Sequence, residues 1–81
     1  MKNRQLVPNL QQPATYEIKV AGHLDLGLAD WIEGMTIAVN AAEDGPSTTT
    51  LTCTVDQAAL IGLLRRLYAL GIPLISVNSV V

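Results

Sequence analysis

Three stretches of the chain alternate apolar with polar residues, which is the pattern of a β-strand with one buried face. They cover residues 16–20, residues 35–40 and Thr48–Val55. Their apolar faces consist of Tyr16, Ile18 and Val20, of Met35, Ile37 and Val39, and of Leu51, Cys53 and Val55. Asp44 and Gly45 stand between the second and third stretches, and this dipeptide predicts a hairpin turn. The outer face of the sheet, which includes Thr50, is polar, and we expect it to be solvated.

Residues 56–70 have the apolar period of an α-helix. Asp56 is the favoured N-cap, because its carboxylate can accept backbone N–H groups that the first turn leaves without partners. Thr54 and Gln57 also have the spacing of a capping box, which would begin the helix two residues earlier. Gly71 supplies the left-handed residue that commonly ends a helix.

The apolar residues of this helix extend well beyond one stripe. The stripe expected to pack on the sheet consists of Leu60, Leu63, Leu64 and Leu67. Ile61 and Tyr68 lie on one flank, and the other flank is formed by Ala59, Gly62 and Ala69. One sheet covers only one side of a helix, so either the loop that carries Trp31 or a second subunit must cover the rest. We therefore predict an interface at Ile61, Arg65, Tyr68 and Trp31.

The last stretch, residues 74–81, is apolar on both sides around Ile75 and Val77, which favours an interior or covered strand. The order β-β-β-α-β predicts an α+β fold with one four-stranded mixed sheet and one main helix packed on one face. A meander with the fourth strand beside the first allows a right-handed crossover through the helix. Residues 23–34 predict a loop with one helical turn at residues 28–33, where Trp31 covers an edge of the core.

Residues 1–14 are polar, and Pro8 and Pro13 interrupt them, so we predict a flexible N-terminal arm at 1–14 and a single domain at 15–81. At 81 residues the core is small, which favours stabilisation by self-association. The lone Cys53 cannot form an intramolecular disulfide, which favours the cytoplasm.

The net charge of −2 and the five Lys and Arg residues argue against binding to nucleic acid. We predict no association with the membrane, because no apolar run approaches the roughly 20 residues that a bilayer requires.

Candidate chemistry is confined to a few side chains. His23, Asp25 and Asp30 lie close together, but their spacing matches no known metal site, so we predict neither a metal nor a cofactor. Cys53 is in register with Leu51, and we expect a buried structural thiol. With no Gly-rich phosphate loop and no nucleophile elbow, the sequence predicts no catalytic residues and no enzyme activity.

From Tyr16 onward the chain resembles a family of small bacterial proteins that have no established activity. The resemblance rests on residues 22–25 (GHLD), 30–35 (DWIEGM), 56–60 (DQAAL), 62–67 (GLLRRL) and 70–77 (LGIPLISV). It covers about four-fifths of the chain and is most specific from residue 56 to residue 77. The resemblance implies a compact α+β fold.

Three functional hypotheses follow. The first is a non-enzymatic association or regulatory module, which forms a homo-oligomer or docks on a partner protein through the helix flank of Ile61, Arg65 and Tyr68. The second is a small-molecule-sensing domain, with the ligand at a subunit interface or under the Trp31 loop. The third and least favoured is an enzyme that uses His23 and Asp25.

Overall fold

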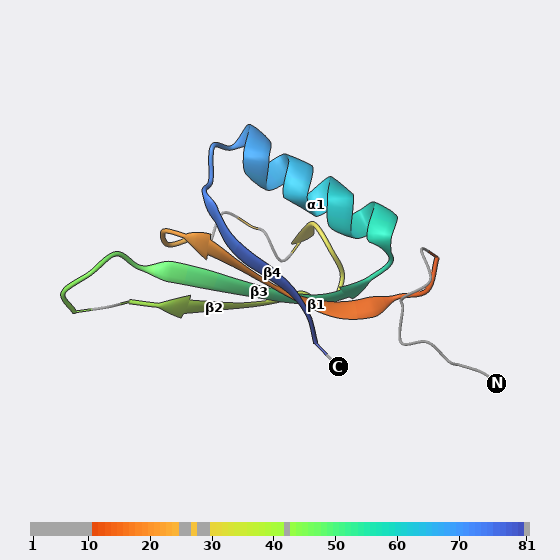
Figure 1. Cartoon of the computed structure of the whole chain (residues 1–81), viewed down its shortest axis with the longest axis horizontal. Coiled ribbons are helices and arrows are strands. Elements are labelled where there is room, and N and C mark those ends of the chain that lie inside the picture. Colours follow the sequence, from red (N-terminus) through yellow and green to blue (C-terminus); the bar gives the residue numbers. More distant parts are fainter. Residues whose placement is uncertain (1–10, 25–26, 28–29, 42, 81) are drawn as a thin grey trace.

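Four strands and one helix follow one another in the order that the sequence predicts (Figure 1). They are β1 (Ala14–Ala21), β2 (Thr36–Asn40), β3 (Thr48–Val55), α1 (Gln57–Ala69) and β4 (Leu74–Val80). This computed structural model describes residues 11–24, 27, 30–41 and 43–80. The α+β class and the element order are confirmed. Most of the predicted N-terminal arm, residues 1–10, lies outside the described residues.

β1 begins at Ala14, two residues before the first alternating residue. Ala14 pairs with Val55 and Thr15 with Thr54, so the strand extends to the full length of β3. The hydroxyl oxygens of Thr15 and Thr54 lie 2.7 Å apart in a side-chain hydrogen bond. Cross-strand pairing therefore extends β1 beyond the part that its apolar pattern marks.

The sheet differs from the predicted one in two respects. Its order is β2-β3-β1-β4, so β3 rather than β2 lies next to β1 and the first three strands do not form a meander. All neighbouring pairs are antiparallel, so the sheet is not mixed. The prediction of β4 beside β1 is correct. Alternation specifies which face of a strand is buried and not which strand is its neighbour. The fully buried Ile18, Val20 and Leu51 belong to β1 and β3, the two central strands.

Helix α1 and the described part of the connection between β1 and β2 lie over the same face of the sheet (Figure 1). β1 and β2 run parallel with β3 between them, and residues 22–35 connect them. β3 and β4 run parallel with β1 between them, and α1 connects them. The result is a split β-α-β arrangement in which a loop takes the place of the first of two crossover helices.

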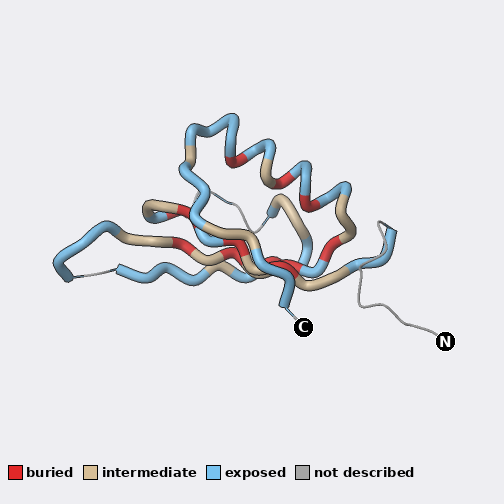
Figure 2. The backbone as a smooth tube through the Cα atoms, in the orientation of Figure 1, coloured by how far each residue is buried: buried red, intermediate tan, exposed pale blue. Residues whose placement is uncertain are grey.

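The core lies between α1 and the sheet, where the buried positions of the strands and of the helix face one another (Figure 2). It consists of Tyr16, Ile18, Val20, Leu24, Met35, Leu51, Cys53, Val55, Leu60, Leu63 and Leu67. The inward faces predicted for residues 16–20 and Thr48–Val55 are thus confirmed. Of the second stretch, Met35 is buried and Ile37 packs against the core, but Val39 is exposed. Leu64 is only half-buried and lies at the border of the helix stripe.

β4 occupies an edge of the sheet, and the prediction of an interior or covered strand is wrong. Leu74 is 51% exposed and Ile75 is 53% exposed. β3 already occupies one side of β1, so the crossover through α1 delivers β4 to the remaining side, which is the border of the sheet. Apolar residues on both faces of a strand do not by themselves fix its place in the sheet.

Candidate association surface and the Trp31 pocket

Hydrogen bonds at both ends of α1 fix the start and the end of the helix. Asp56 is the N-cap, as predicted, and its carboxylate oxygen Oδ1 accepts a hydrogen bond of 2.9 Å from the Ala59 N–H. At the other end, Gly71 has φ +75°, and its N–H donates to the Tyr68 carbonyl oxygen at 2.9 Å. The N–H of Ile72 donates to the carbonyl oxygen of Leu67, which completes a capped C-terminus.

The buried side of α1 consists of Leu60, Leu63 and Leu67, and this stripe leaves two flanks. On the helical period, Ile61, Leu64 and Tyr68 share one flank. Ile61 is 47% exposed and Tyr68 is 85% exposed. This flank therefore presents large apolar side chains to solvent.

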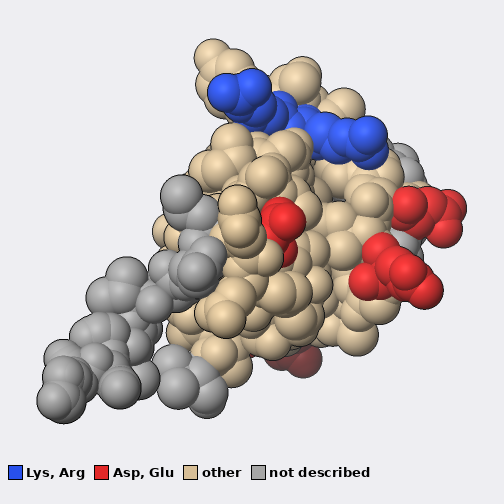
Figure 3. Space-filling view, turned by 90° about the vertical axis from the view of Figure 1, so that its right-hand side faces the viewer, with Lys and Arg blue, Asp and Glu red and all other residues tan. Residues whose placement is uncertain are grey.

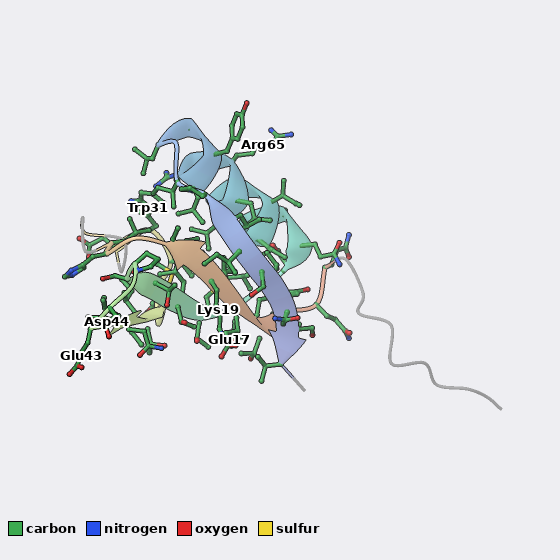
Figure 4. The ribbon with its side chains drawn as sticks, turned by 60° about the vertical axis from the view of Figure 1, so that its left-hand side comes forward. Glu17, Lys19, Trp31, Glu43, Asp44 and Arg65 are labelled. Atoms are coloured by element: carbon green, nitrogen blue, oxygen red, sulfur yellow. The ribbon has the colours of Figure 1, made fainter. Side chains whose placement is uncertain are left out.

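The exposed flank faces the side of the molecule where β4 lies. α1 carries the chain from β3 across β1 to β4, whereas the loop with Trp31 runs towards β2. Trp31 and Arg65 lie on opposite sides of the helix in Figure 4. The flank away from Trp31 is thus the one nearer β4.

β4 adds apolar side chains to that flank. Leu74 pairs with Val20 and Val77 with Ile18, and both partners are fully buried beneath the helix. Leu74 and Val77 therefore lie on the helix face of the sheet. We use the term β4-side surface for the set formed by Ile61, Leu64, Tyr68, Leu74, Ile75 and Val77.

The opposite flank of α1 borders a pocket that has a volume of about 200 Å³. It is lined by Trp31, Ile32, Ala59, Gly62, Leu63 and Arg66. The central guanidinium carbon of Arg66 lies 4.9 Å from the centroid of the Trp31 ring, within cation–π range. Trp31 is half-buried and packs against the core, as expected for a residue that covers its edge.

The structure separates the four residues of the predicted interface into two groups. Ile61 and Tyr68 lie on the flank nearer β4, and the exposed Arg65 lies beyond them on the same side. Trp31 lies on the other flank, against Arg66. The β4 members of the surface were not predicted, because their exposure depends on the position of β4 at the edge.

Thr49 holds the start of the loop that carries Trp31. It is fully buried, and its hydroxyl donates a 2.6 Å hydrogen bond to the Gly22 carbonyl oxygen. The same hydroxyl oxygen accepts a 3.1 Å bond from the Leu24 N–H. The role of Thr49 could not be predicted from the sequence, since a Thr within a Thr-rich strand carries no signal of its inward orientation beyond the alternation itself.

Part of the helical turn predicted in this loop is present. The N–H of Asp30 donates to the carbonyl oxygen of Gly27 at 3.0 Å, which is the bond of a single tight turn. A second bond, of 3.2 Å, joins the N–H of Met35 to the carbonyl oxygen of Ile32. Residues 28 and 29 of the predicted turn lie outside the described residues.

The residues considered for chemistry lie in different environments. His23 and Asp30 are exposed, and Asp25 lies outside the described residues. Cys53 is a buried free thiol, as predicted, and burial raises the pKa of this thiol above its ordinary value. A raised pKa lowers the fraction of reactive thiolate at neutral pH. The environment of Cys53 is therefore that of a structural residue.

Charged side chains are sparse around these features. Basic side chains gather over α1 in Figure 3, and Arg65 and Arg66 belong to this helix. Glu17 and Lys19 lie on the face of the sheet away from the helix, and Glu43 and Asp44 lie near the turn between β2 and β3 (Figure 4). In the described ranges, no three His, Cys, Asp or Glu side chains are grouped as a metal ion requires. The described helix is also too short to cross a bilayer.

Comparison with known proteins gives one match. Residues 15–78 match a family described as a domain of unknown function, DUF8691. No curated protein and no solved structure matches the chain. The matched segment spans all four strands and the helix, starting one residue inside β1 and ending two residues before the last residue of β4. The chain therefore belongs to the DUF8691 family, as the sequence resemblance to small proteins without established activity suggested.

Proposed function

We propose that this domain is a non-enzymatic association module that acts in the cytoplasm and assembles through the β4-side surface. One observation carries the proposal. Of the seven large hydrophobic residues that are exposed in the described part of the chain, four belong to this surface: Ile61, Tyr68, Leu74 and Ile75. Exposed apolar residues gathered on one side of a small domain are typical of a protein–protein contact.

The composition of this surface also fits an interface. It joins an aromatic residue, Tyr68, to aliphatic residues, with Arg65 beyond its edge. Tyr and Arg are enriched in interfaces, and a charged residue is tolerated at a rim where it stays in water. A core as small as this one gains stability when a second subunit covers apolar surface. These features favour a homo-oligomer over a monomeric domain.

The test is the solution mass of the full chain, measured by size-exclusion chromatography with light scattering. We expect a mass of at least twice the 8.6 kDa of one chain. A Tyr68→Lys variant should shift this mass towards that of a single chain, because it places a charge in the contact. Val39→Lys is the matched control, since Val39 is 38% exposed on β2 at the opposite edge of the sheet.

Two results would refute the proposed self-association. One is a wild-type chain that stays at 8.6 kDa up to millimolar concentration. The other is an equal decrease in solution mass in the Tyr68→Lys and Val39→Lys variants, because the decrease would then not be specific to the β4-side surface. Circular dichroism of both variants establishes that they are folded.

The pocket beside Trp31 favours a second function, which is the sensing of a small molecule. Its apolar lining and the single charged side chain of Arg66 suit a compact organic anion with an apolar body. Binding to the native state would raise the thermal midpoint and change the fluorescence of Trp31, the only tryptophan of the chain. A panel of small carboxylates and phosphates tests this. If no compound changes the thermal midpoint or the Trp31 fluorescence at concentrations that saturate weak sites, this function is eliminated.

The proposal includes the absence of enzyme activity, of nucleic-acid binding and of a required cofactor. An enzyme that uses His23 and Asp25 is the least supported reading, because His23 is exposed and does not line the pocket beside Trp31. A His23→Ala variant should retain the solution mass and every ligand response of the wild type. A response lost only in that variant would count against the proposal.

A further inference from the structure

The free edge of β4 has unpaired backbone groups at regular positions. The Ala21 N–H donates to the Pro73 carbonyl oxygen on the β4 side, whereas the Gly22 N–H donates to the Ser47 carbonyl oxygen on the β3 side. In an antiparallel pair the bonding groups alternate residue by residue. Thr15, Glu17 and Lys19 thus point their backbone groups at β4, towards their respective partners Val80, Asn78 and Ser76. The N–H and C=O groups of the intervening Ile75, Val77 and Ser79 point away from the sheet.

β4 also lacks the features with which proteins usually protect a sheet edge. It has no charged residue and no proline over seven residues, Leu74–Val80. Its irregularity, the shift of register opposite Lys19 and Val20, lies at its beginning and leaves the remainder regular. A long, uncharged, apolar edge is one that pairs with another strand. The other edge, β2, has only five residues.

We propose that β4 pairs antiparallel with β4 of a second copy of this chain, about a two-fold axis at Val77, so that two sheets join into one of eight strands. Val77 is the midpoint of Leu74–Val80, so a pairing centred there overlaps the whole strand. It also matches the three outward residues with one another: Val77 with Val77 of the partner, and Ile75 with Ser79 of the partner. This inference rests on the proposed association function and specifies its partner and geometry.

A second copy fits this edge because a two-fold axis brings identical groups together. An edge with a charge near its centre would repel itself, and β4 has none. Val77 and Leu74 lie on the helix face, so the exposed flanks of the two α1 helices would approach each other above the joined strands. Both parts of the β4-side surface would then be covered at once.

The available area suffices for such a contact. From their exposed fractions, the four exposed members of the β4-side surface, Ile61, Tyr68, Leu74 and Ile75, present on the order of 500 Å². A standard interface buries about 800 Å² on each partner. The β4 backbone and the remaining side chains of the strand supply the difference.

Disulfide cross-linking tests the register of this pairing. In the proposed arrangement Ser76 lies opposite Asn78 of the partner, in a non-hydrogen-bonded pair with Cα atoms about 4.5 Å apart, which is a disulfide-compatible distance. Both residues lie on the polar face of the sheet, since they pair with Lys19 and Glu17. Ser76→Cys and Asn78→Cys are therefore expected to leave the core intact.

The two variants are mixed under reducing conditions, oxidised, and run on a denaturing gel. We expect the band to shift from 8.6 kDa to twice that mass in the mixture, and the shift to be lost on reduction. Each variant alone should give no such band, because identical positions are offset by two residues on the partner. Wild-type protein, which retains the buried Cys53, provides the baseline.

The outcomes separate this inference from the proposed function. Two outcomes would overturn β4 pairing if the wild type is an oligomer. The mixed variants give no cross-link, or each single variant cross-links as well as the mixture does. Association through the β4-side surface would remain supported in both cases. A strictly monomeric wild type would overturn both. A cross-link that requires both cysteines supports both.

Discussion

The hydroxyl of Thr49 offers a sharp test of how the Trp31 loop is held in place. It forms two hydrogen bonds, to the Gly22 carbonyl oxygen and from the Leu24 N–H, and Thr49 itself is fully buried. Thr49→Val replaces the hydroxyl with a methyl group of nearly the same size. The substitution therefore leaves the packing almost unchanged and removes both bonds.

The expected loss follows from the groups that are left without partners. A buried polar group without a hydrogen bond costs about 1–3 kcal/mol. The Leu24 bond is buried, whereas the Gly22 bond is only partly buried, so water can replace part of the second. We expect a decrease of about 2–3 kcal/mol in the free energy of unfolding. For a domain of this size the thermal midpoint falls by roughly 4–8 °C per kcal/mol, which gives a decrease of about 8–24 °C.

Urea unfolding followed by circular dichroism and by Trp31 fluorescence measures the effect, at one fixed protein concentration because association would stabilise the native state. Thr49→Ser is the matched control, since it keeps the hydroxyl and loses one methyl group, at a cost of about 1 kcal/mol. A Thr49→Val variant as stable as the wild type, or more stable than Thr49→Ser, would show that these hydrogen bonds do not hold the loop.

Four further predictions concern the helix ends and the buried thiol. Asp56→Ala should lower the free energy of unfolding by about 1 kcal/mol, because the Ala59 N–H loses its acceptor. Asp56→Asn is the control and should retain most of the stability. Equal losses of stability in the two variants, measured by urea titration, would contradict this prediction. Gly71→Ala should cost about 1 kcal/mol through its φ of +75° alone, since no atom beyond its two chain neighbours lies within 4 Å of the added Cβ. An unchanged urea midpoint would refute this prediction. Native Cys53 should react with a thiol reagent only after unfolding, and rapid labelling at neutral pH without urea would contradict its burial. The pKa of this thiol is raised in the folded protein, so its contribution to stability is complete below the unfolded pKa near 9.0 and is lost as the pH rises further. The wild type should therefore lose more stability than Cys53→Ala when the pH is raised from 7 to values above 9.0.

Local signals in the sequence accounted for the elements and for their buried faces. Asp56 and Gly71 act on backbone groups within a few residues of themselves, so the ends of α1 could be predicted without any knowledge of the sheet. The same holds for the inward orientation of Leu51 and Cys53, because successive side chains of a strand alternate between its faces.

The neighbours of each strand could not be predicted in this way. The pairing of β1 with β3 and the edge position of β4 depend on contacts between residues far apart in the sequence. The apolar character of β4 was correctly recognised but wrongly interpreted as a sign of an interior strand. Its exposure makes it part of the β4-side surface, whereas the interface predicted from the sequence comprised Ile61, Arg65 and Tyr68 of the helix and Trp31 of the loop.

The sequence by itself determined which residues of α1 remain apolar outside the core stripe, because the helical period fixes the angles between Ile61, Tyr68 and Leu63. Only the tertiary structure decided what lies beside each flank. The hydrogen bonds of Thr49 and the contact between Trp31 and Arg66 place the loop on one side, and the crossover to β4 leaves the other side exposed. Period and capping are properties of neighbouring residues, whereas the covering of a flank results from packing between distant ones.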